Sequence, residues 1–286
     1  MRSLILKLIP QFLRRPLAGI RDRVFREDSE SDVLHRLAEQ LPSGHYVQRM
    51  RSLELRGIPD DHLRAIVDDY RAFSYENYKY GAELDPIRIP GGIIEAVMMS
   101  NDIPGELAEC GVYQGSTAKM IRNIADVDKK LHLFDTFEGF TEDDRAMEVE
   151  KGMGRDPGPE LKQTSLERAK NRVFSDFPHS GRRFSDDSVI FHQGPVDETL
   201  DGVGDTSFSF VHLDMDLYEP MRFAMEFFIP RMSEQGVLMI HDFAVPGSGY
   251  KGVYNAYESV DTESLTGPLP FGDHSTALFI KKSPKQ

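Results

Sequence analysis

Short apolar segments typical of buried strands alternate with segments of helical periodicity along most of this chain. Strands are predicted at residues 105–112, 130–135, 189–192, 208–213, 236–240 and 278–280. Helices are predicted at residues 61–70, 93–99, 117–125, 165–173 and 220–229. Strands that alternate with helices form an α/β fold with a doubly wound, mostly parallel sheet. The alternation therefore predicts this fold class.

The chain is predicted to have two regions. We expect residues 1–85 to form a helical N-terminal extension that serves oligomerisation and acts as a lid region, and residues 86–286 to form the α/β domain. Within that domain, residues 140–159 are polar, contain Gly and Pro and lack periodicity, so a long loop is expected. Long loops in compact domains are often lids or binding loops. This segment is therefore expected to close over a ligand.

Composition excludes several classes of protein. The chain has 40% hydrophobic and 28% charged residues, as ordinary globular proteins do. Its 47 acidic and 34 basic residues give a formal net charge of −13, which excludes a nucleic-acid partner because such binding needs Lys and Arg to neutralise phosphates. The single cysteine, Cys110, cannot form an internal disulfide, so a cytoplasmic location is expected. No apolar run approaches the roughly 20 residues of a membrane span.

The N-terminus differs in charge from the rest of the chain. Residues 1–21 contain five basic residues and no acid, and their apolar residues recur at near-helical spacing. We expect residues 1–25 to form a helix that packs on its own domain or on a sister subunit, which favours a homo-oligomer. A basic amphipathic helix on an anionic membrane surface is the alternative, and a transit-like presequence is a third.

The first predicted strand ends in a turn suited to ligand binding. In doubly wound sheets, ligands bind at the carboxyl ends of the strands. Gly111 and Gly115 allow the backbone to turn tightly and to approach a ligand closely. Glu109 offers a carboxylate that suits an ammonium or hydroxyl group and would repel a pyrophosphate. A pyrophosphate would prefer a bare glycine turn with exposed helix N–H groups.

The second predicted strand ends in Asp135, which lies 26 residues after Glu109. An acid at this place typically accepts hydrogen bonds from ribose hydroxyls. Alternatively, both acids cap helix N-termini, where negative charge is favourable. The pair, each at a strand end, favours a nucleoside-containing cofactor.

A second set of candidate residues follows the fourth and fifth strands. Asp214 and Asp216 end the fourth strand, and His241 and Asp242 end the fifth, 27 and 28 residues after Asp214. Carboxylate and imidazole donors without a thiolate suit a divalent ion such as Mg²⁺ or Mn²⁺. The alternative is a set of exposed helix caps with a half-buried histidine. The matched strand ends favour the metal site.

Four segments together resemble the macrocin O-methyltransferase family. They are Ile103-Pro104-Gly105 with Glu109-Cys110-Gly111-Val112, then Asp135-Thr136-Phe137-Glu138-Gly139-Phe140, then Leu213-Asp214-Met215-Asp216-Leu217-Tyr218-Glu219-Pro220, and the strand from Gly236 to Asp242. The resemblance covers roughly residues 90–260. It implies the Rossmann-like fold of class I methyltransferases, S-adenosylmethionine as cofactor, and often Mg²⁺.

The resemblance also implies a role for each candidate residue. The cofactor would be held by Glu109, Gly111, Tyr113, Gly115, Ser116, Asp135 and Asp214. Asp214 and Asp242 would bind the metal and Asp216 would be the general base. The family usually has Asp-Asp where this chain has His241-Asp242, so the expected metal ligands are two carboxylates and an imidazole, with Mg²⁺, Mn²⁺ or another divalent ion bound. His241 is an alternative general base.

The implied reaction is methyl transfer to a hydroxyl of a sugar or glycosylated natural product. A metal would lower the pKa of the hydroxyl, and the base would take its proton. The acidic rim suits a neutral, polyhydroxylated small-molecule acceptor. Two alternatives remain. One is a nicotinamide-dependent oxidoreductase, although the turn lacks the G-x-G-x-x-G pattern. The other is a non-catalytic cofactor-binding scaffold.

Overall fold

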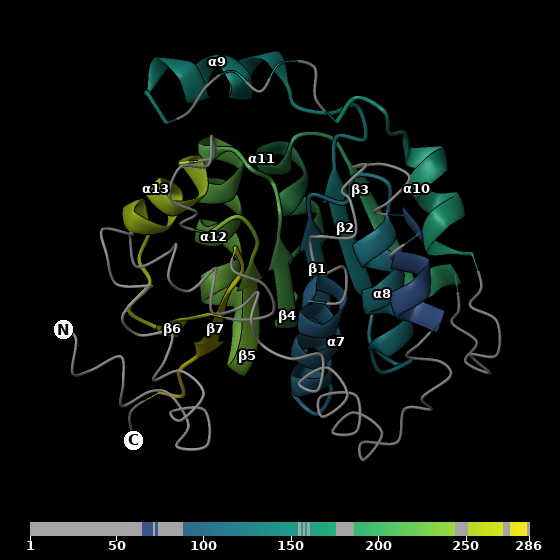
Figure 1. Cartoon of the computed structure of the whole chain (residues 1–286). Helices are drawn as coiled ribbons and strands as arrows, with labels where there is room; N and C mark the ends of the chain where they lie inside the picture. Colours follow the sequence, from purple (N-terminus) through teal and green to yellow (C-terminus); the bar gives the residue numbers. More distant parts are fainter. Residues whose placement is uncertain are drawn as a thin grey trace, which may run out of the picture. The chain divides into compact units, whose positions relative to one another are not determined.

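The computed structural model of the chain (Figure 1) describes residues 65–70, 72–73, 88–153, 156, 158, 161–175, 186–243, 251–270 and 275–284. The predicted helix at residues 1–25 and most of the predicted extension over residues 1–85 lie outside the described residues. Residues 65–70 are helical, within the helix predicted at 61–70. Among the described helices, none combines the length and apolar character needed to cross a bilayer.

Seven strands of the described chain form one sheet. They are β1 (Glu106–Cys110), β2 (Leu131–Asp135), β3 (Val189–Gln193), β4 (Phe208–Leu213), β5 (Met232–Ile240), β6 (Leu265–Pro270) and β7 (Ala277–Lys281). Their order in the sheet is β3-β2-β1-β4-β5-β7-β6. The first five strands are mutually parallel, whereas β7 pairs antiparallel with β5 and β6. The prediction of a doubly wound, mostly parallel sheet is confirmed.

The strand order reverses between β1 and β4. From β1 the chain adds β2 and β3 on one side, and then β4 and β5 on the other side. Such a reversal leaves a crevice at the carboxyl ends of the two central strands, where ligands of these folds bind. The topology therefore places a ligand site between the ends of β1 and β4.

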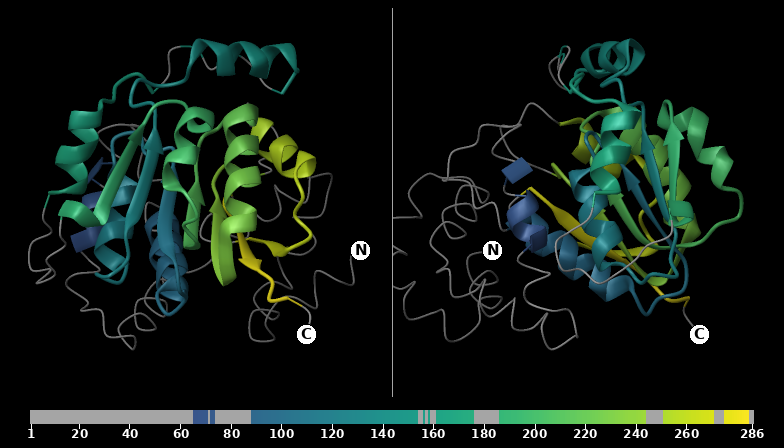
Figure 2. Two further views of the ribbon diagram at one scale, coloured as in Figure 1. Left: turned by 180° about the vertical axis from the view of Figure 1, so that it is seen from behind. Right: turned by 90° about the vertical axis from the view of Figure 1, so that its right-hand side faces the viewer.

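Helices cover both faces of the sheet (Figure 2). The described helices are α7 (Arg88–Ser100), α8 (Ser116–Ile124), α9 (Glu142–Glu150), α10 (Leu166–Val173), α11 (Val196–Thr199), α12 (Tyr218–Arg231) and α13 (Gly252–Ser259). Two short 3₁₀ helices, η2 (Asp186–Ser188) and η3 (Leu200–Val203), join them. α7, α8 and α10 contribute to one buried apolar cluster, and α11, α12 and α13 contribute to another.

Alternate residues of each central strand enter the two clusters. In β1, Leu107 belongs to the cluster under α7 and α8, whereas Ala108 and Cys110 belong to the cluster under α12. Successive side chains of a strand point to opposite faces of the sheet. Strands buried on both faces read as nearly continuous apolar runs, as parallel strands of this kind do.

The expectation of an irregular loop over residues 140–159 was wrong for α9. This helix begins after Thr141, whose hydroxyl accepts a hydrogen bond from the N–H of Asp144 at 3.0 Å. Three acidic residues occupy its first turn, where their negative charges interact favourably with the positive end of the helix dipole. α9 has no apolar periodicity because Glu148 is its single buried residue. The capping pattern of Thr141 followed three residues later by Asp144 could have predicted the start of this helix, which apolar periodicity could not.

Three further elements were not predicted. They are α11, α13 and the edge strand β6. β5 also begins at Met232, four residues before the predicted start; Met232 is buried, but residues 233–235 are partly or fully exposed. A register irregularity between β4 and β5 lies beside this start. Short or partly exposed elements carry little apolar patterning, which explains these misses.

Candidate active site

The predicted site residues gather where β1, β4 and β5 end. In the sheet, Cys110 pairs with Leu213, and Leu213 pairs with Ile240. The N–H of Asp214 donates to the carbonyl of Cys110 at 2.9 Å, and the N–H of His241 donates to the carbonyl of Leu213 at 2.9 Å. The residues that follow these three strands therefore lie next to one another.

Gly111 lies at the closest approach between β1 and β4. Its φ is 87°, in the left-handed region that favours glycine. A Cβ at this position would lie 1.9 Å from the carbonyl oxygen of Asp214. The turn after β1 can therefore pack against the end of β4 only with glycine at this position.

Asp135, at the end of β2, holds the turn after β1 through its carboxylate. Oδ2 accepts hydrogen bonds from the N–H groups of Val112 and Tyr113, both at 2.8 Å, and Oδ1 accepts one from Phe137 at 2.6 Å. Tyr113 and Phe137 have φ values of 50° and 56°, which non-glycine residues rarely adopt. Burial raises the pKa of Asp135, and the three N–H donors oppose that shift. Asp135 thus fixes two strained turns rather than capping a helix.

Glu109 is fully buried and pairs with a histidine. Its Oε1 lies 2.9 Å from Nδ1 of His212 on β4. Its other oxygen, Oε2, is buried without a hydrogen-bond partner among the described residues. Burial raises the pKa of Glu109, and the contacts with His212 and with the hydroxyl of Thr117 oppose the shift. His212 was not predicted; a lone histidine in an otherwise apolar strand was the available signal.

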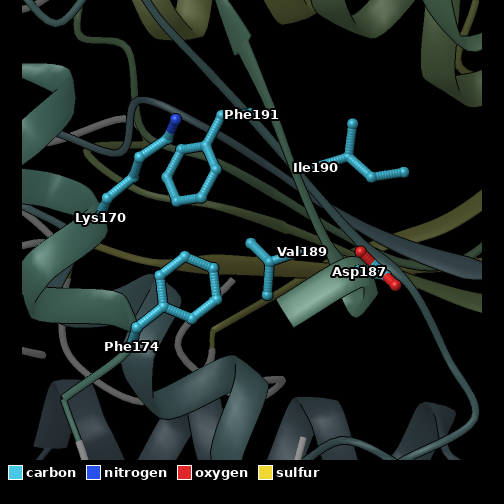
Figure 3. A pocket seen from close by; sticks show the side chains of 6 residues that line it. All are labelled: Lys170, Phe174, Asp187, Val189, Ile190 and Phe191. Atoms are coloured by element: carbon cyan, nitrogen blue, oxygen red, sulfur yellow. The ribbon is translucent and has the colours of Figure 1, made fainter. Parts of the chain in front are cut away.

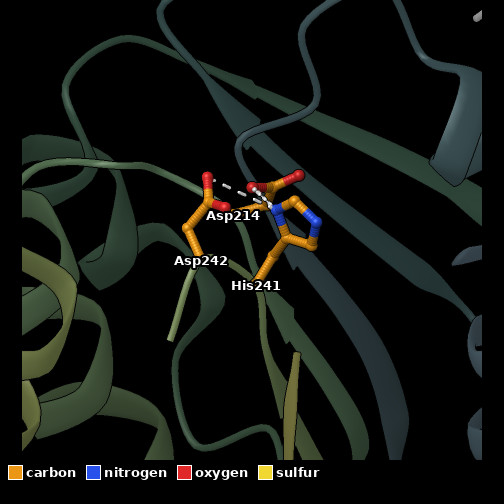
Figure 4. Close-up of side chains that lie close together, drawn as sticks. All are labelled: Asp214, His241 and Asp242. Carbon is orange, nitrogen blue, oxygen red and sulfur yellow. Dashed lines mark hydrogen bonds and ion pairs between the residues drawn. The ribbon is translucent and has the colours of Figure 1, made fainter. Parts of the chain in front are cut away.

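Asp214, His241 and Asp242 form a cluster of metal-ligand type (Figure 4). One potential ligand atom from each residue lies within 4.8 Å of the other two. Nδ1 of His241 is 3.0 Å from Oδ1 of Asp214 and 3.6 Å from Oδ2 of Asp242. On the other side of the ring, Nε2 lies 3.5 Å from Oγ of Ser275. This geometry agrees with the prediction that the three side chains lie close together.

Asp216 lies beside the cluster in a strained conformation. Its φ is 62°, and that of Asp242 is 51°. Burial raises the pKa of Asp216 well above its ordinary value, and the charges of Asp214 and Asp242 raise it further. A hydrogen bond with Asp242 also favours the protonated form, while His241 opposes it. Non-glycine residues with positive φ are often found at functional sites.

The remaining predicted cofactor residues lie in the same turn. Gly115, with a φ of 83°, precedes α8, and no side chain caps this helix. A Cβ on Gly115 would lie 2.9 Å from Cγ2 of Val173. Ser116, the first residue of α8, is buried, and its hydroxyl lies 3.4 Å from Nη2 of Arg172. The carbonyl of Tyr113 accepts a hydrogen bond from Thr164.

α9 is attached to the site by a buried carboxylate that was not predicted. In Figure 1 the helix lies at the top, on the side of the sheet where β2 ends. Oε2 of Glu148 accepts a hydrogen bond at 2.9 Å from the N–H of Tyr218, two residues after Asp216. Lys151, just after α9, also pairs with Glu219 of α12. α9 is thereby held next to the turn that carries Asp216.

A separate pocket of about 470 Å³ opens along the edge strand β3 (Figure 3). Its lining comes from α10 and the residue that follows it, from η2 and from β3, and consists of Lys170, Phe174, Asp187, Val189, Ile190 and Phe191. Within the sheet, β2 and β1 separate β3 from β4. The pocket is therefore distinct from the acidic cluster at the ends of β4 and β5.

A comparison with family models matches residues 90–279 to "Macrocin-O-methyltransferase (TylF)". The match covers two thirds of the chain and includes every predicted site residue. This chain belongs to the macrocin O-methyltransferase family. Members of the family are O-methyltransferases, so the predicted enzyme class is confirmed and the nicotinamide-dependent oxidoreductase is disfavoured.

Two curated relatives are O-methyltransferases, and the name of the first includes a rhamnosyl sugar. The chain is 28% identical over 182 residues to the 8-demethyl-8-(2,3-dimethoxy-alpha-L-rhamnosyl)-tetracenomycin-C 4'-O-methyltransferase of Streptomyces olivaceus. That match covers 59% of this chain and 67% of the relative. It is 27% identical over 155 residues to the mycinamicin III 3''-O-methyltransferase of Micromonospora griseorubida, covering 52% of this chain and 59% of the relative.

Solved structures confirm the fold of this macrocin O-methyltransferase family member. The O-methyltransferase NovP matches with a TM-score of 0.51 and 20% identity, over 69% of this chain and 81% of NovP. The calicheamicin methyltransferase CalS11 matches with a TM-score of 0.52 and 19% identity, over 90% of this chain and 95% of CalS11. The predicted class I methyltransferase fold is therefore confirmed.

Proposed function

We propose that this protein transfers a methyl group from S-adenosylmethionine to a hydroxyl of a sugar or glycosylated natural product, with the help of a divalent cation. The observation that carries the proposal is the cluster of Asp214, His241 and Asp242 beside Asp216, next to the turn after β1. The two curated relatives are named as O-methyltransferases of a rhamnosyl-tetracenomycin and of mycinamicin III. This kinship supports a glycoside as the acceptor.

The residues around Glu109 fit the methionine part of the cofactor. Oε2 of Glu109 is buried without a partner among the described residues, and an unpaired buried carboxylate oxygen is costly. An ammonium group from the cofactor would satisfy this oxygen. The uncapped N-terminus of α8, after Gly115, would present N–H groups to the cofactor's carboxylate.

Asp135 would contribute to the ribose site by accepting a hydrogen bond from a ribose hydroxyl. A carboxylate has about four lone-pair positions for hydrogen bonds. Three backbone N–H groups occupy three of them, and the hydroxyl of Thr136 contacts Oδ1 at 3.5 Å. A ribose hydroxyl would take the place of this long Thr136 contact, so the main role of Asp135 would be to shape the turn on which the cofactor lies.

The metal-ligand cluster fits a six-coordinate divalent ion. Ligands 2.0–2.1 Å from an ion lie about 3 Å apart on adjacent corners of an octahedron. The 3.0 Å and 3.6 Å separations of Nδ1 of His241 from Asp214 and Asp242 are close to that value. With Nδ1 as ligand, Nε2–H of His241 would donate to Ser275, as ligating histidines usually do to a neighbouring acceptor. A bound cation would act as a Lewis acid that lowers the pKa of the acceptor hydroxyl.

Asp216 is the proposed general base. Without a cation, its raised pKa favours the protonated form, which cannot accept a proton. Positive charge at the ligand cluster favours the carboxylate. Asp216 would then accept the proton of the hydroxyl while the sulfonium of the bound cofactor provides the electrophilic methyl group. In a metal-free enzyme, His241 would be the alternative base.

Binding of Mn²⁺, measured by electron paramagnetic resonance without cofactor or acceptor, tests the metal site separately from activity. We expect stoichiometric binding to the wild-type protein and a loss of about ten-fold or more in affinity for Asp242→Asn. Asp128→Asn, an exposed position with the same change in charge, serves as the matched control. Equal affinity of the two variants would contradict the assignment of these ligands.

A further inference from the structure

Glu109 and His212 form a buried pair across the two central strands. They are register partners of β1 and β4. Their side chains are 0% and 2% exposed, and Oε1 of Glu109 lies 2.9 Å from Nδ1 of His212. When Glu109 is ionised its oxygens only accept hydrogen bonds, and Nδ1–H of His212 is then the donor.

Half of this pair lacks a partner among the described residues. Oε2 of Glu109 and Nε2 of His212 are both buried and form no hydrogen bond. Apolar side chains of the sheet lie on the same strands, including Leu107 and Phe210. Two well-packed apolar residues would serve stability better than a half-satisfied polar pair. The pair therefore points to a role beyond packing.

The unsatisfied oxygen lies at the ligand-binding end of the sheet. Glu109 is the penultimate residue of β1, two residues before Gly111, whose turn touches the end of β4. The charge of Asp214 also acts on Glu109. One carboxylate oxygen thus faces a fixed donor, and the other is buried without a hydrogen bond of its own, although the hydroxyl of Thr117 also acts on the carboxylate.

We propose that His212 is a positioning residue that orients Glu109 toward the ammonium group of the cofactor. This inference rests on the proposed function, in which Glu109 binds the methionine part. The Nδ1–H of His212 holds Oε1 and so fixes the rotation of the carboxylate group. Oε2 is then presented to the ammonium without the cost of ordering a free side chain.

Two amide substitutions separate the nitrogen atoms of His212. Asn places an amide near the position of Nδ1, which donates to Glu109. Gln reaches instead toward the position of Nε2, which has no partner. The two variants therefore differ in the one hydrogen bond that the proposal needs, while both remove the imidazole ring.

Two probes separate the methionine part from the rest of the cofactor. S-adenosylhomocysteine carries the amino acid group, whereas 5′-methylthioadenosine lacks it. By calorimetry, we expect His212→Gln to bind S-adenosylhomocysteine about ten-fold more weakly than the wild type, because it loses a hydrogen bond to a charged group. The same variant should bind 5′-methylthioadenosine as tightly as the wild type does. His212→Asn should keep the wild-type ratio of the two affinities.

The outcomes distinguish this inference from the proposed function. Equal weakening for both probes in His212→Gln would show a merely structural role and overturn the inference. The inference would also be overturned if His212→Gln keeps the wild-type ratio of the two affinities while Glu109→Gln weakens the binding of S-adenosylhomocysteine alone. No effect in Glu109→Gln would refute the proposed place of the methionine part. If His212→Gln does not fold, the ratio in His212→Asn decides, and an altered ratio there overturns the inference.

Discussion

Replacing Asp135 by Asn should weaken the hydrogen bonds that hold the two turns of the candidate cofactor site. The substitution keeps the size of the side chain but converts one acceptor oxygen into an NH₂ donor. Asn can therefore serve either Phe137, or Val112 and Tyr113, but not both. The smaller loss is the single bond to Phe137.

The magnitude follows from the count of hydrogen bonds. A hydrogen bond to a charged group contributes about 1.5–3 kcal/mol, and a neutral one about 0.5–1.5 kcal/mol. One bond lost and two weakened from charged to neutral should lower the free energy of unfolding of Asp135→Asn by about 5 kcal/mol. For a domain of this size, the melting temperature should fall by about 10–20 °C.

Chemical denaturation of Asp135→Asn and of the control Asp128→Asn measures this effect. Asp128 is exposed and undergoes the same change in charge. The stability of the control should stay within about 0.5 kcal/mol of the wild type. If both variants unfold at the same denaturant concentration, the carboxylate of Asp135 does not hold the strained residues, and the reasoning fails.

Three further predictions concern stability and local order. The pKa of His192 is lowered to about 4 by burial and then by a neighbouring histidine. The unfolded chain therefore binds more protons than the folded chain between about pH 6.5 and 4, so the free energy of unfolding should fall as the pH drops through that window, by at most about 3 kcal/mol and by less after screening of the partly exposed ring. His192→Gln should flatten this pH dependence in urea denaturation. Glu148→Ala leaves the first N–H of α12 unpaired, so amide hydrogen exchange in α9 should accelerate about ten-fold, whereas the exposed Glu150→Ala should not accelerate it. Gly111→Ala should cost more than about 4 kcal/mol or prevent folding, because its Cβ would lie 1.9 Å from a backbone carbonyl oxygen. Denaturation compared with Gly91→Ala checks this, because a Cβ at Gly91 would meet no neighbouring part of the protein within 4 Å.

The sequence predicted the central sheet because its strands are buried on both faces. Phe208–Leu213, for example, is buried at every residue, and its end carries Asp214 and Asp216. Since the carboxyl ends of parallel strands share one edge of the sheet, strand ends alone predicted the meeting of Asp214, His241 and Asp242. The geometry of this cluster agrees with that prediction.

Other features depend on contacts that no local pattern encodes. α9 has no apolar face, because its one buried side chain is the carboxylate of Glu148. The pairing of Glu109 with His212 depends on the register between β1 and β4. The sequence predicts a ribose contact for Asp135, but its hydrogen bonds to the backbone appear only when the two turns are placed in space. Periodicity reports burial of apolar side chains, and it misses elements held by buried polar groups.

Metal-assisted methyl transfer from S-adenosylmethionine to a sugar hydroxyl can be tested directly. A labelled methyl group is followed from the cofactor into a panel of neutral glycosides, in EDTA and after Mg²⁺ or Mn²⁺ is restored. We expect a methyl ether that forms only with the cation, and a loss of about 100-fold or more in Asp216→Asn. Undiminished transfer in EDTA would contradict the metal site, and binding of S-adenosylhomocysteine without transfer to any hydroxylated acceptor would contradict the enzyme itself.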